Sequence, residues 1–360
     1  MRPDIIVRMI PGPGPGFAHF RRRLPMLIKA IAPMRADLAG GTLDIYPLHV
    51  FMHRAVSVNV SLTLTSEVTI EPRDDSRIVI VSEDLGVEQS APGADALDPN
   101  GPLGFLARIV RFYPPKQGMV MHTKNNVPKG SGLGASSTLL IAVSHALQAL
   151  NGTNYSKDQL IDTGCNIEAE YIQVPAGKQD HFGATYGGLS AIHFEHAGNR
   201  HERISGDEDF LRALDERLII SFAGAPRFSG ASNWNMFKAY VDGDSQAREH
   251  LNTIKRIADD MLGALRARDL DAFARLLDEE WRHRRKIAPG VSTPEIETMM
   301  TAAQAAGALA GKICGAGGGG CMVTVAPPEK RDAVRSALNA AGARVMDCAI
   351  SRTGVSVTVD

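Results

Sequence analysis

The segment that most constrains this chain is the glycine-rich stretch PKGSGLGASST at residues 128–138. Gly130, Gly132 and Gly134 alternate with small residues, so the backbone can turn tightly there and bring several N–H groups toward an anion. The apolar run at 139–150 predicts a helix directly afterwards, whose N-terminus favours a phosphate. No Lys-Ser or Lys-Thr follows the last glycine, so the stretch is not the common P-loop. Taken alone, it is either a phosphate cradle or an ordinary loop that opens a buried helix.

Length and composition limit the function classes. A chain of 360 residues exceeds what one hydrophobic core usually organises, so we expect two domains. Its 44% hydrophobic and 22% charged residues are typical of a soluble globular protein. The net charge of −1 gives no reason to expect nucleic acid or a membrane surface as a partner. No apolar run approaches the roughly 18 residues of a membrane span.

The cysteines and histidines argue against a disulfide or transition-metal framework. Cys165, Cys314, Cys321 and Cys348 are far apart and form no Cys-x-x-Cys pair. We interpret them as reduced thiols of a cytoplasmic protein. The eleven histidines are scattered, without the spacing of a metal site.

The first 25 residues differ from the rest of the chain. PGPGPG at 11–16 cannot form a helix or a central strand, and three arginines follow at 21–23. The segment lacks the apolar core of a secretory signal. We expect residues 1–25 to be a flexible extension, which a start codon assigned too far upstream would explain, and folded sequence to begin near Met26.

Hydrophobic periodicity predicts strands followed by blocks of helices. Strand-like segments lie at 27–38, 55–70, 77–82 and 189–194, and again at 217–222, 321–325 and 354–359. Helical periodicity covers 245–268, 269–286, 293–307 and 329–341. This arrangement favours an α+β fold over regular βαβ winding.

A helix that starts near Ser156 carries an acid on its apolar stripe. Ser156 and Gln159 have the spacing of a capping box. Glu168 falls on the same face as Ile161 and Cys165, and an inward carboxylate needs a partner or a cation. Pro175-Ala176-Gly177 ends this helix, and we expect Lys178-Gln179-Asp180 to follow in a loop.

Two further glycine motifs accompany the first. Residues 32–44 read APMRADLAGGTLD, and residues 312–321 read KICGAGGGGC. In order, the three segments resemble the signature motifs of the GHMP kinases, and they extend over nearly the whole chain. The resemblance implies a two-domain α+β fold. Residues 26–205 would form a ribosomal-protein-like N-terminal domain, and residues 206–360 a ferredoxin-like C-terminal domain.

Within that family the chain resembles bacterial heptose-7-phosphate kinases. The Gly-Lys-Gln-Asp element at 177–180, Tyr-Gly-Gly at 186–188 and the segments 222–229 and 289–296 carry this likeness, together with Trp281. One departure lies in the first motif, which reads Gly-Gly-Thr-Leu-Asp at 40–44, where those enzymes usually have Gly-Gly-Gly-Thr-Asp. The following residues, 45–49, also differ. These residues should border the acceptor, so the departures bear on which substrate the protein binds.

The resemblance implies an ATP and Mg²⁺ site. Mg²⁺ prefers hard oxygen ligands and keeps several waters, so one hydroxyl and one carboxylate suffice. We assign these to Ser137 and Glu168, with Ser136 as the alternative hydroxyl. The ATP phosphates are assigned to Lys129, Gly130, Ser131, Gly132, Leu133, Gly134, Ala135, Ser136 and Ser137.

The resemblance also suggests the reacting residues. Asp180 is the predicted catalytic acid, which either takes the proton of the acceptor hydroxyl or orients that hydroxyl. Arg35 is the cation expected to keep it ionised. The predicted acceptor-binding residues are Asp44, Lys178, Arg227, Gly317 and Gly318.

Three functions remain open at this stage. The first is an ATP-dependent kinase that acts on a sugar or sugar phosphate as a monomer or homodimer. The second is a mevalonate-type kinase, against which Arg35 and the Gly-Lys-Gln-Asp element argue. The third is a non-catalytic sugar-binding regulator, against which Asp180 and the intact glycine loop argue.

Overall fold

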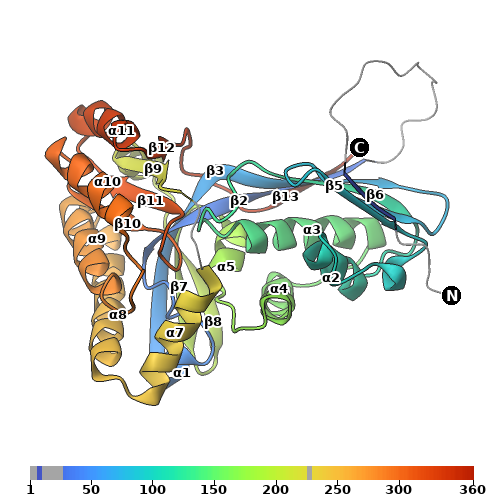
Figure 1. Cartoon of the computed structure of the whole chain (residues 1–360), viewed down its shortest axis with the longest axis horizontal. Helices are drawn as coiled ribbons and strands as arrows, with labels where there is room; N and C mark the ends of the chain where they lie inside the picture. Colours follow the sequence, from blue (N-terminus) through green and yellow to red (C-terminus); the bar gives the residue numbers. More distant parts are fainter. Residues whose placement is uncertain (1–5, 10–26, 225–228) are drawn as a thin grey trace.

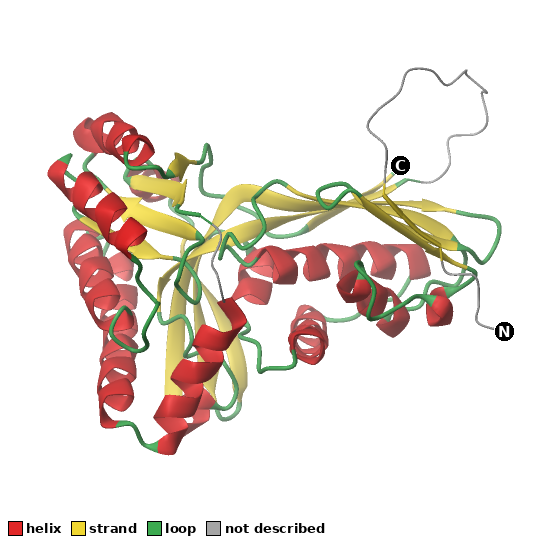
Figure 2. Ribbon diagram, in the orientation of Figure 1, coloured by secondary structure: helices red, strands yellow, loops and turns green. Residues whose placement is uncertain are grey.

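The computed structural model describes residues 6–9, 27–224 and 229–360 (Figure 1). Of the predicted extension 1–25, it describes only strand β1 (Ile6–Met9), which pairs antiparallel with strand β5 (Val87–Ala91). The chain forms one long sheet with helices on one face, and a smaller sheet with its own helices at one end (Figure 2). The predicted α+β class is confirmed.

The larger sheet is organised around one long strand. Strand β3 (Arg54–Pro72) pairs with β6 along residues 66–72 and with β7 along residues 54–60, while β2 runs along its other edge. The sheet order is β1-β5-β4-β6-β3-β2-β13, with β7 and β8 continuing from the first half of β3. The bounds are β2 (Ile28–Ala39), β4 (Ile78–Ser82), β6 (Met119–Asn125), β7 (Leu189–Glu195), β8 (Gly198–Ser205) and β13 (Ser356–Val359).

Four helices cover one face of the outer half of this sheet (Figure 1). They are α2 (Gly104–Phe112), α3 (Ala135–Asn151), α4 (Lys157–Ile172) and α5 (Gln179–Tyr186). Helix α3 is apolar on most sides because it lies between the sheet and the other helices, as its fully buried segment 140–143 shows. The capping box of Ser156 and Gln159 at the start of α4 is confirmed. A one-turn helix, α1 (Leu48–Phe51), precedes β3.

The structure corrects one prediction here. Gln179 and Asp180 lie in the first turn of helix α5, not in a loop, and Lys178 is its N-cap. The helix starts shortly after Gly177, which forms a β-bridge with Ile45, and the acid in its first turn complements the helix dipole.

The smaller sheet is antiparallel, in the order β10-β11-β9-β12. Its strands are β9 (Leu218–Phe222), β10 (Ala310–Ile313), β11 (Cys321–Val325) and β12 (Arg344–Val345). The helices of this region are α6 (Glu208–Asp215), α7 (Ser229–Asp242), α8 (Ser245–Arg266), α9 (Leu270–Arg284), α10 (Pro294–Ala305) and α11 (Arg331–Ala340). Every helix in the described residues is too short or too polar to cross a bilayer.

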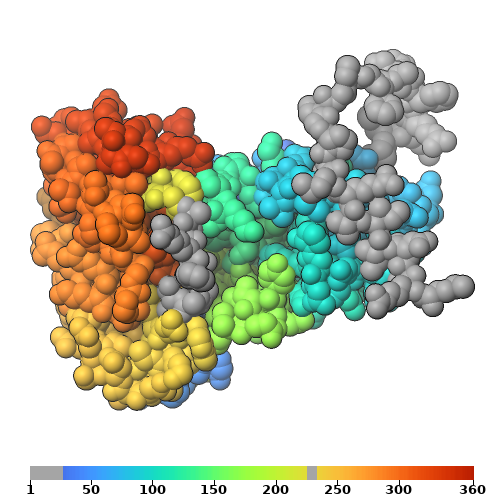
Figure 3. Space-filling model, in the orientation of Figure 1, coloured from blue at the N-terminus to red at the C-terminus, as the bar shows by residue number. Residues whose placement is uncertain are grey.

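The two regions share a hydrophobic core. Val58 of β3 belongs to the same buried cluster as Met261 of α8, Leu277 of α9 and Val323 of β11. Strand β13, from the end of the chain, pairs with β2 in the larger sheet. In Figure 3 the C-terminal helices, in orange and red, form one end of the molecule, and the green residues of the sheet's helices lie at its middle. The two regions therefore pack as one body around the first half of β3.

Candidate active site

The glycine loop has the backbone geometry of an anion cradle. Gly130, Gly132 and Gly134 have φ angles of 76°, 69° and 76°, a region that other residues rarely occupy. Helix α3 begins at Ala135 directly after this loop, and no side chain caps its N-terminus. Its first N–H groups are therefore available to a bound anion.

The third glycine motif packs directly on this loop. The Cys321 N–H donates to the carbonyl of Ser131 at 2.6 Å. A Cβ atom built on Gly132 would lie 2.6 Å from the Cys314 carbonyl oxygen, and one on Gly320 would lie 3.0 Å from that of Ser131. Glycines thus allow the main chains of the two motifs to touch, which joins the smaller sheet to the loop.

Arg35 and Asp180 form an ion pair beside the loop. The Arg35 Nε donates to Asp180 Oδ1 at 2.7 Å, a second N–H of the guanidinium reaches the same oxygen, and Nη1 donates to the Gly132 carbonyl at 2.8 Å. Burial alone would lower the pKa of Arg35, but the carboxylates of Asp180 and Asp37 raise it. Asp180 stays partly accessible, with 22% of its side chain exposed. A Cβ atom on Gly134 would lie 2.9 Å from its Cγ and Oδ2, so the acid lies against the loop.

Glu168 faces the first turn of α3. Ser137 donates to its Oε2 at 2.6 Å, and Ser136 donates to its Oε1. The carboxylate is 8% exposed, and His181 Nε2 lies 3.4 Å from Oε2. One buried carboxylate with two hydroxyl oxygens fits Mg²⁺, which takes few protein ligands and completes its shell with water and phosphate oxygens. Ser136 is exposed and Ser137 is buried, so the inner hydroxyl is the one held deepest beside the acid.

Asp44 joins the first motif to helix α5. It is buried, and its Oδ2 accepts from the Gln179 N–H at 3.0 Å. A Cβ atom on Gly177 would lie 2.1 Å from that oxygen, so only glycine fits there. Burial raises the pKa of Asp44 to about 6, with a further contribution from Asp180 and Asp37. Asp44 and Asp180 are thus held near one another at the start of α5.

The remaining predicted site residues are Lys129, Lys178, Arg227, Gly317 and Gly318. Lys178 forms an ion pair with Asp162 at 2.6 Å. Gly318 donates to the Val291 carbonyl at 2.9 Å, and Gly317 has that same residue against it. Lys129 is exposed, and Arg227 lies outside the described residues.

Sequence reasoning missed the polar side chains of β3 that hold the site. Ser57 donates to the Gly40 carbonyl at 2.9 Å, Asn59 to that of Gln179 at 3.3 Å and Ser61 to that of Gly183 at 3.0 Å. All three side chains are buried, so both the first motif and α5 are fixed to one strand. The alternation of these residues with valine was visible, but alternation also describes a solvent-facing strand.

A buried charge network was also missed. Lys312 of β10 donates to Asp37 of β2 at 2.7 Å and lies 3.1 Å from Glu280 of α9, which in turn binds Arg284. None of the four side chains is more than 1% exposed. Burial would raise the pKa of Asp37, but Lys312, Arg284 and Arg35 lower it. Two carboxylates and two cations therefore balance one another between the two sheets.

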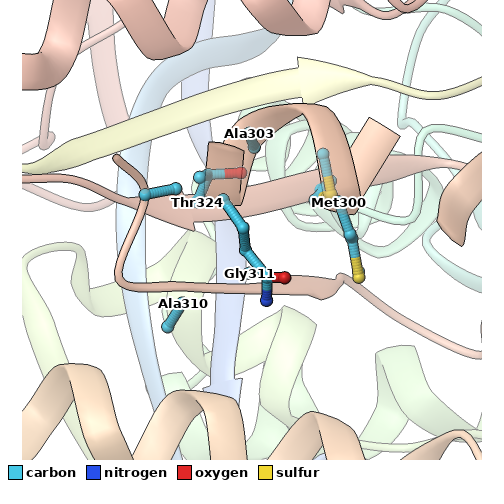
Figure 4. Close-up of a pocket in the computed structure, with 8 residues that line it drawn as sticks. Met300, Ala303, Ala310, Gly311 and Thr324 are labelled. Atoms are coloured by element: carbon cyan, nitrogen blue, oxygen red, sulfur yellow. The ribbon is translucent and has the colours of Figure 1, made fainter. Parts of the chain in front are cut away.

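A small pocket in the described residues lies elsewhere. It is lined from α10, β10 and β11 by residues that include Met300, Ala303, Ala310, Gly311 and Thr324 (Figure 4). None of its lining side chains is charged. A phosphate needs cations or converging N–H groups, so this pocket does not suit the nucleotide.

Family models match both regions of the chain. A model described as the N-terminal domain of GHMP kinases matches residues 103–188, which hold the glycine loop and α3 to α5. One described as GHMP kinases C terminal matches residues 261–344, which hold α9, α10 and the third motif. The chain is a GHMP kinase. It is accordingly an ATP-dependent phosphotransferase with an alcohol group as acceptor.

This GHMP kinase is similar to characterised relatives along most of its length. It is 28% identical to the D-glycero-alpha-D-manno-heptose 7-phosphate kinase of Campylobacter jejuni, over 91% of this chain and 98% of that protein. It is 27% identical to the mevalonate kinase of Thermococcus onnurineus, over 67% and 69%.

Solved structures share the fold. The crystal structure of a D-glycero-D-manno-heptose 1-phosphate kinase from Bacteroides thetaiotaomicron matches with a TM-score of 0.75 and 25% identity, over 92% of this chain and 98% of that one. Lactococcus lactis galactokinase complexed with galactose matches with a TM-score of 0.74 and 20% identity, over 92% and 95%. The second likeness concerns the fold alone.

Proposed function

We propose that this GHMP kinase uses Mg²⁺ and ATP to phosphorylate a hydroxyl of a sugar phosphate, with a heptose 7-phosphate as the favoured acceptor. The observation that carries the proposal is the Asp180 carboxylate, which Arg35 holds against Gly134 of the glycine loop. A phosphate on that loop and an acceptor hydroxyl beside Asp180 would then be neighbours, and phosphoryl transfer depends mainly on such positioning.

The nucleotide side follows from the loop and the helix after it. The converging N–H groups of residues 129–137 bind the phosphates, and the N-terminus of α3 adds a favourable potential. Ser137 and Glu168 hold the magnesium ion, which when bound neutralises charge on the transferring phosphate. Ser136, already bonded to Glu168, keeps that carboxylate oriented.

The acceptor side involves both acids. Asp180 accepts a hydrogen bond from the reacting hydroxyl and takes its proton or orients it, while Arg35 holds the carboxylate in place. Asp44 binds other hydroxyls of the acceptor. Lys178 and Arg227 are the proposed cations for a phosphate already on the substrate, and Lys178 would then exchange Asp162 for that phosphate.

The choice of a heptose phosphate rests on similarity. The relative named for heptose 7-phosphate is 28% identical over 91% of this chain, whereas mevalonate kinases are either 27% identical over 67% of it or 23% identical over 93% of it. Arg35 and the Gly-Lys-Gln-Asp element at 177–180 also favour a sugar kinase over a mevalonate-type kinase.

The first prediction concerns Asp180. We expect ADP release with heptose 7-phosphate, and a loss of about 10²–10⁴-fold in kcat for Asp180→Asn, because that variant keeps the side chain's shape but cannot accept a proton. The dissociation constant of the nucleotide, measured by titration calorimetry, should remain within about threefold of the wild-type value, which corresponds to about 0.7 kcal/mol of binding free energy.

The matched control is Asp158→Asn. Asp158 is exposed and is likewise the second residue of a helix, α4, so it tests the loss of an acid from a first turn without affecting the site. The acceptor panel also contains heptose 1-phosphate, hexoses, mevalonate and homoserine. Full turnover by Asp180→Asn would refute the assigned role, and turnover of mevalonate alone would refute the acceptor class.

A further inference from the structure

Thr42 occupies a backbone conformation that its side chain disfavours. Its φ angle is 77°, in the left-handed region where a β-branched residue is an outlier. It stands at the third position of the segment Gly-Gly-Thr-Leu-Asp at 40–44, where the enzymes that the first motif resembles usually have glycine. Surrounding contacts must therefore hold this residue in place.

Those contacts are made by the Thr42 hydroxyl. It donates to Asn233 Oδ1 of α7 at 3.1 Å and accepts from Arg284 Nη1 of α9 at 3.3 Å. The side chain is 4% exposed, so water cannot readily replace either partner. One hydroxyl thus connects the first motif to two helices that lie about 190 and 240 residues further along the chain.

Arg284 itself is held rigidly. Its Nε donates to Glu280 at 2.7 Å, Nη2 donates to the Gly41 carbonyl at 2.9 Å, and the side chain is 1% exposed. Glu280 is fixed in turn by Lys312 at 3.1 Å. Because every one of these groups is buried, Arg284 presents its remaining N–H groups to residues 41 and 42 in one orientation.

Asp44 lies two residues beyond this junction. Its carboxylate accepts a hydrogen bond from the Gln179 N–H at 3.0 Å. The segment 41–44 is therefore held at both ends, by Arg284 and Thr42 at one and by α5 at the other.

We propose that Thr42 is a positioning residue for acceptor binding: its bonds to Arg284 and Asn233 hold the segment 41–44 so that Asp44 meets the acceptor hydroxyls. This inference rests on the proposed role of Asp44 in the sugar phosphate kinase. It assigns to Thr42 a task that a glycine at this position could not perform, since glycine has no hydroxyl.

The test compares Thr42→Val with Thr42→Ser. Valine keeps the branched shape and the backbone cost but leaves Arg284 and Asn233 without their partner. We expect the KM for the acceptor to rise about tenfold in Thr42→Val, because the variant loses a hydrogen bond to a charged group. The KM for ATP should stay within about twofold of the wild-type value, which corresponds to about 0.4 kcal/mol. Thr42→Ser should restore the acceptor KM.

The control is Thr298→Val on α10, where an exposed hydroxyl donates only to the Pro294 carbonyl of its own helix. An unchanged acceptor KM in Thr42→Val, or an equal rise in both KM values, would overturn the proposal. If Thr42→Val does not fold, Arg284→Lys decides, because lysine keeps the charge but cannot reproduce the fixed fork that reaches both Gly41 and Thr42. An unchanged acceptor KM there would overturn the proposal equally.

The acceptor panel, measured with the wild-type enzyme, distinguishes a failure of the Thr42 proposal from a failure of the proposed function. If no sugar phosphate is phosphorylated, that function fails. The Thr42 comparison is then made with the acceptor that the wild type does phosphorylate.

Discussion

At the residue scale, Asp44 is an acid whose ionised form is destabilised by its surroundings in the fold. Its carboxyl has a pKa of about 6 instead of 3.8, because burial penalises the ionised form and Asp180 and Asp37 repel it. This rise corresponds to about 3 kcal/mol of differential free energy. Between about pH 4 and pH 6 the folded protein binds more protons at Asp44 than the unfolded chain does, so the free energy of unfolding decreases as the pH rises.

Asp44→Asn should remove this dependence. We expect the variant to gain up to about 3 kcal/mol relative to the wild type as the pH rises from 4 to 7, measured by denaturant unfolding at each pH. Acceptor affinity of the wild type should improve over the same range, because hydrogen bonds from hydroxyls to the ionised carboxylate are stronger than those to the neutral acid. Asp74→Asn, at an exposed position, is the control. Parallel pH profiles for Asp44→Asn and the wild type would contradict the assignment.

Some residues of the candidate site could be predicted from the sequence and others could not. Arg35 and Asp180 each lie in a short motif, and Glu168 interrupts an apolar stripe, so the sequence marks them as candidates, and their roles stay predictions. The bond from Lys312 to Asp37 spans 275 residues, and no local pattern marks either residue as the other's partner. A buried ion pair between distant segments is determined by the packing of the sheets, which periodicity alone does not reveal.

At the element scale, helix α3 begins and ends with a glycine in the left-handed region. Gly134 at its N-terminus has a φ of 76° and Gly152 at its C-terminus a φ of 64°. The two differ in their surroundings. A Cβ atom on Gly134 would lie 2.9 Å from the Asp180 side chain, whereas nothing lies within 4 Å of one on Gly152.

This pair gives a matched prediction. Gly134→Ala and Gly152→Ala should each cost about 1–2 kcal/mol of stability for the left-handed backbone. Only Gly134→Ala also displaces Asp180, so it alone should lower kcat by about a hundredfold, given how sharply turnover depends on such positioning. Unfolding curves and steady-state kinetics for both variants provide the comparison. Equal kcat values would show that Asp180 does not act at the glycine loop.

Element boundaries followed from the sequence where a cap or a long period marked them. Strand β3, helix α3 and helix α9 lie close to their predicted ranges. Helix α5 was missed because its eight residues contain too few turns to show a period, and its placement depends on hydrogen bonds from Arg35 of β2 and from Asn59 and Ser61 of β3.

At the scale of the whole molecule, the two sheets are joined by charge as well as by apolar contacts. Lys312 of the smaller sheet binds Asp37 of the larger one and lies beside Glu280, all out of contact with water. Chain length and the family resemblance predicted two domains, but the pairing of β13 with β2 and the core shared by α8, α9 and β3 arise only from the tertiary fold.

Lys312→Met should therefore destabilise the molecule as a unit. It leaves Asp37 and Glu280 buried with one cation fewer, which costs about 3–5 kcal/mol. The double variant Lys312→Met/Glu280→Gln removes one cation and one carboxylate charge, so its loss of stability should be smaller than the sum of the two single losses. Denaturant unfolding of all three variants measures this coupling, with Lys330→Met at an exposed position as the control. Strictly additive losses would mean that Lys312 and Glu280 act independently of each other, and that this ion pair does not help to join the two sheets.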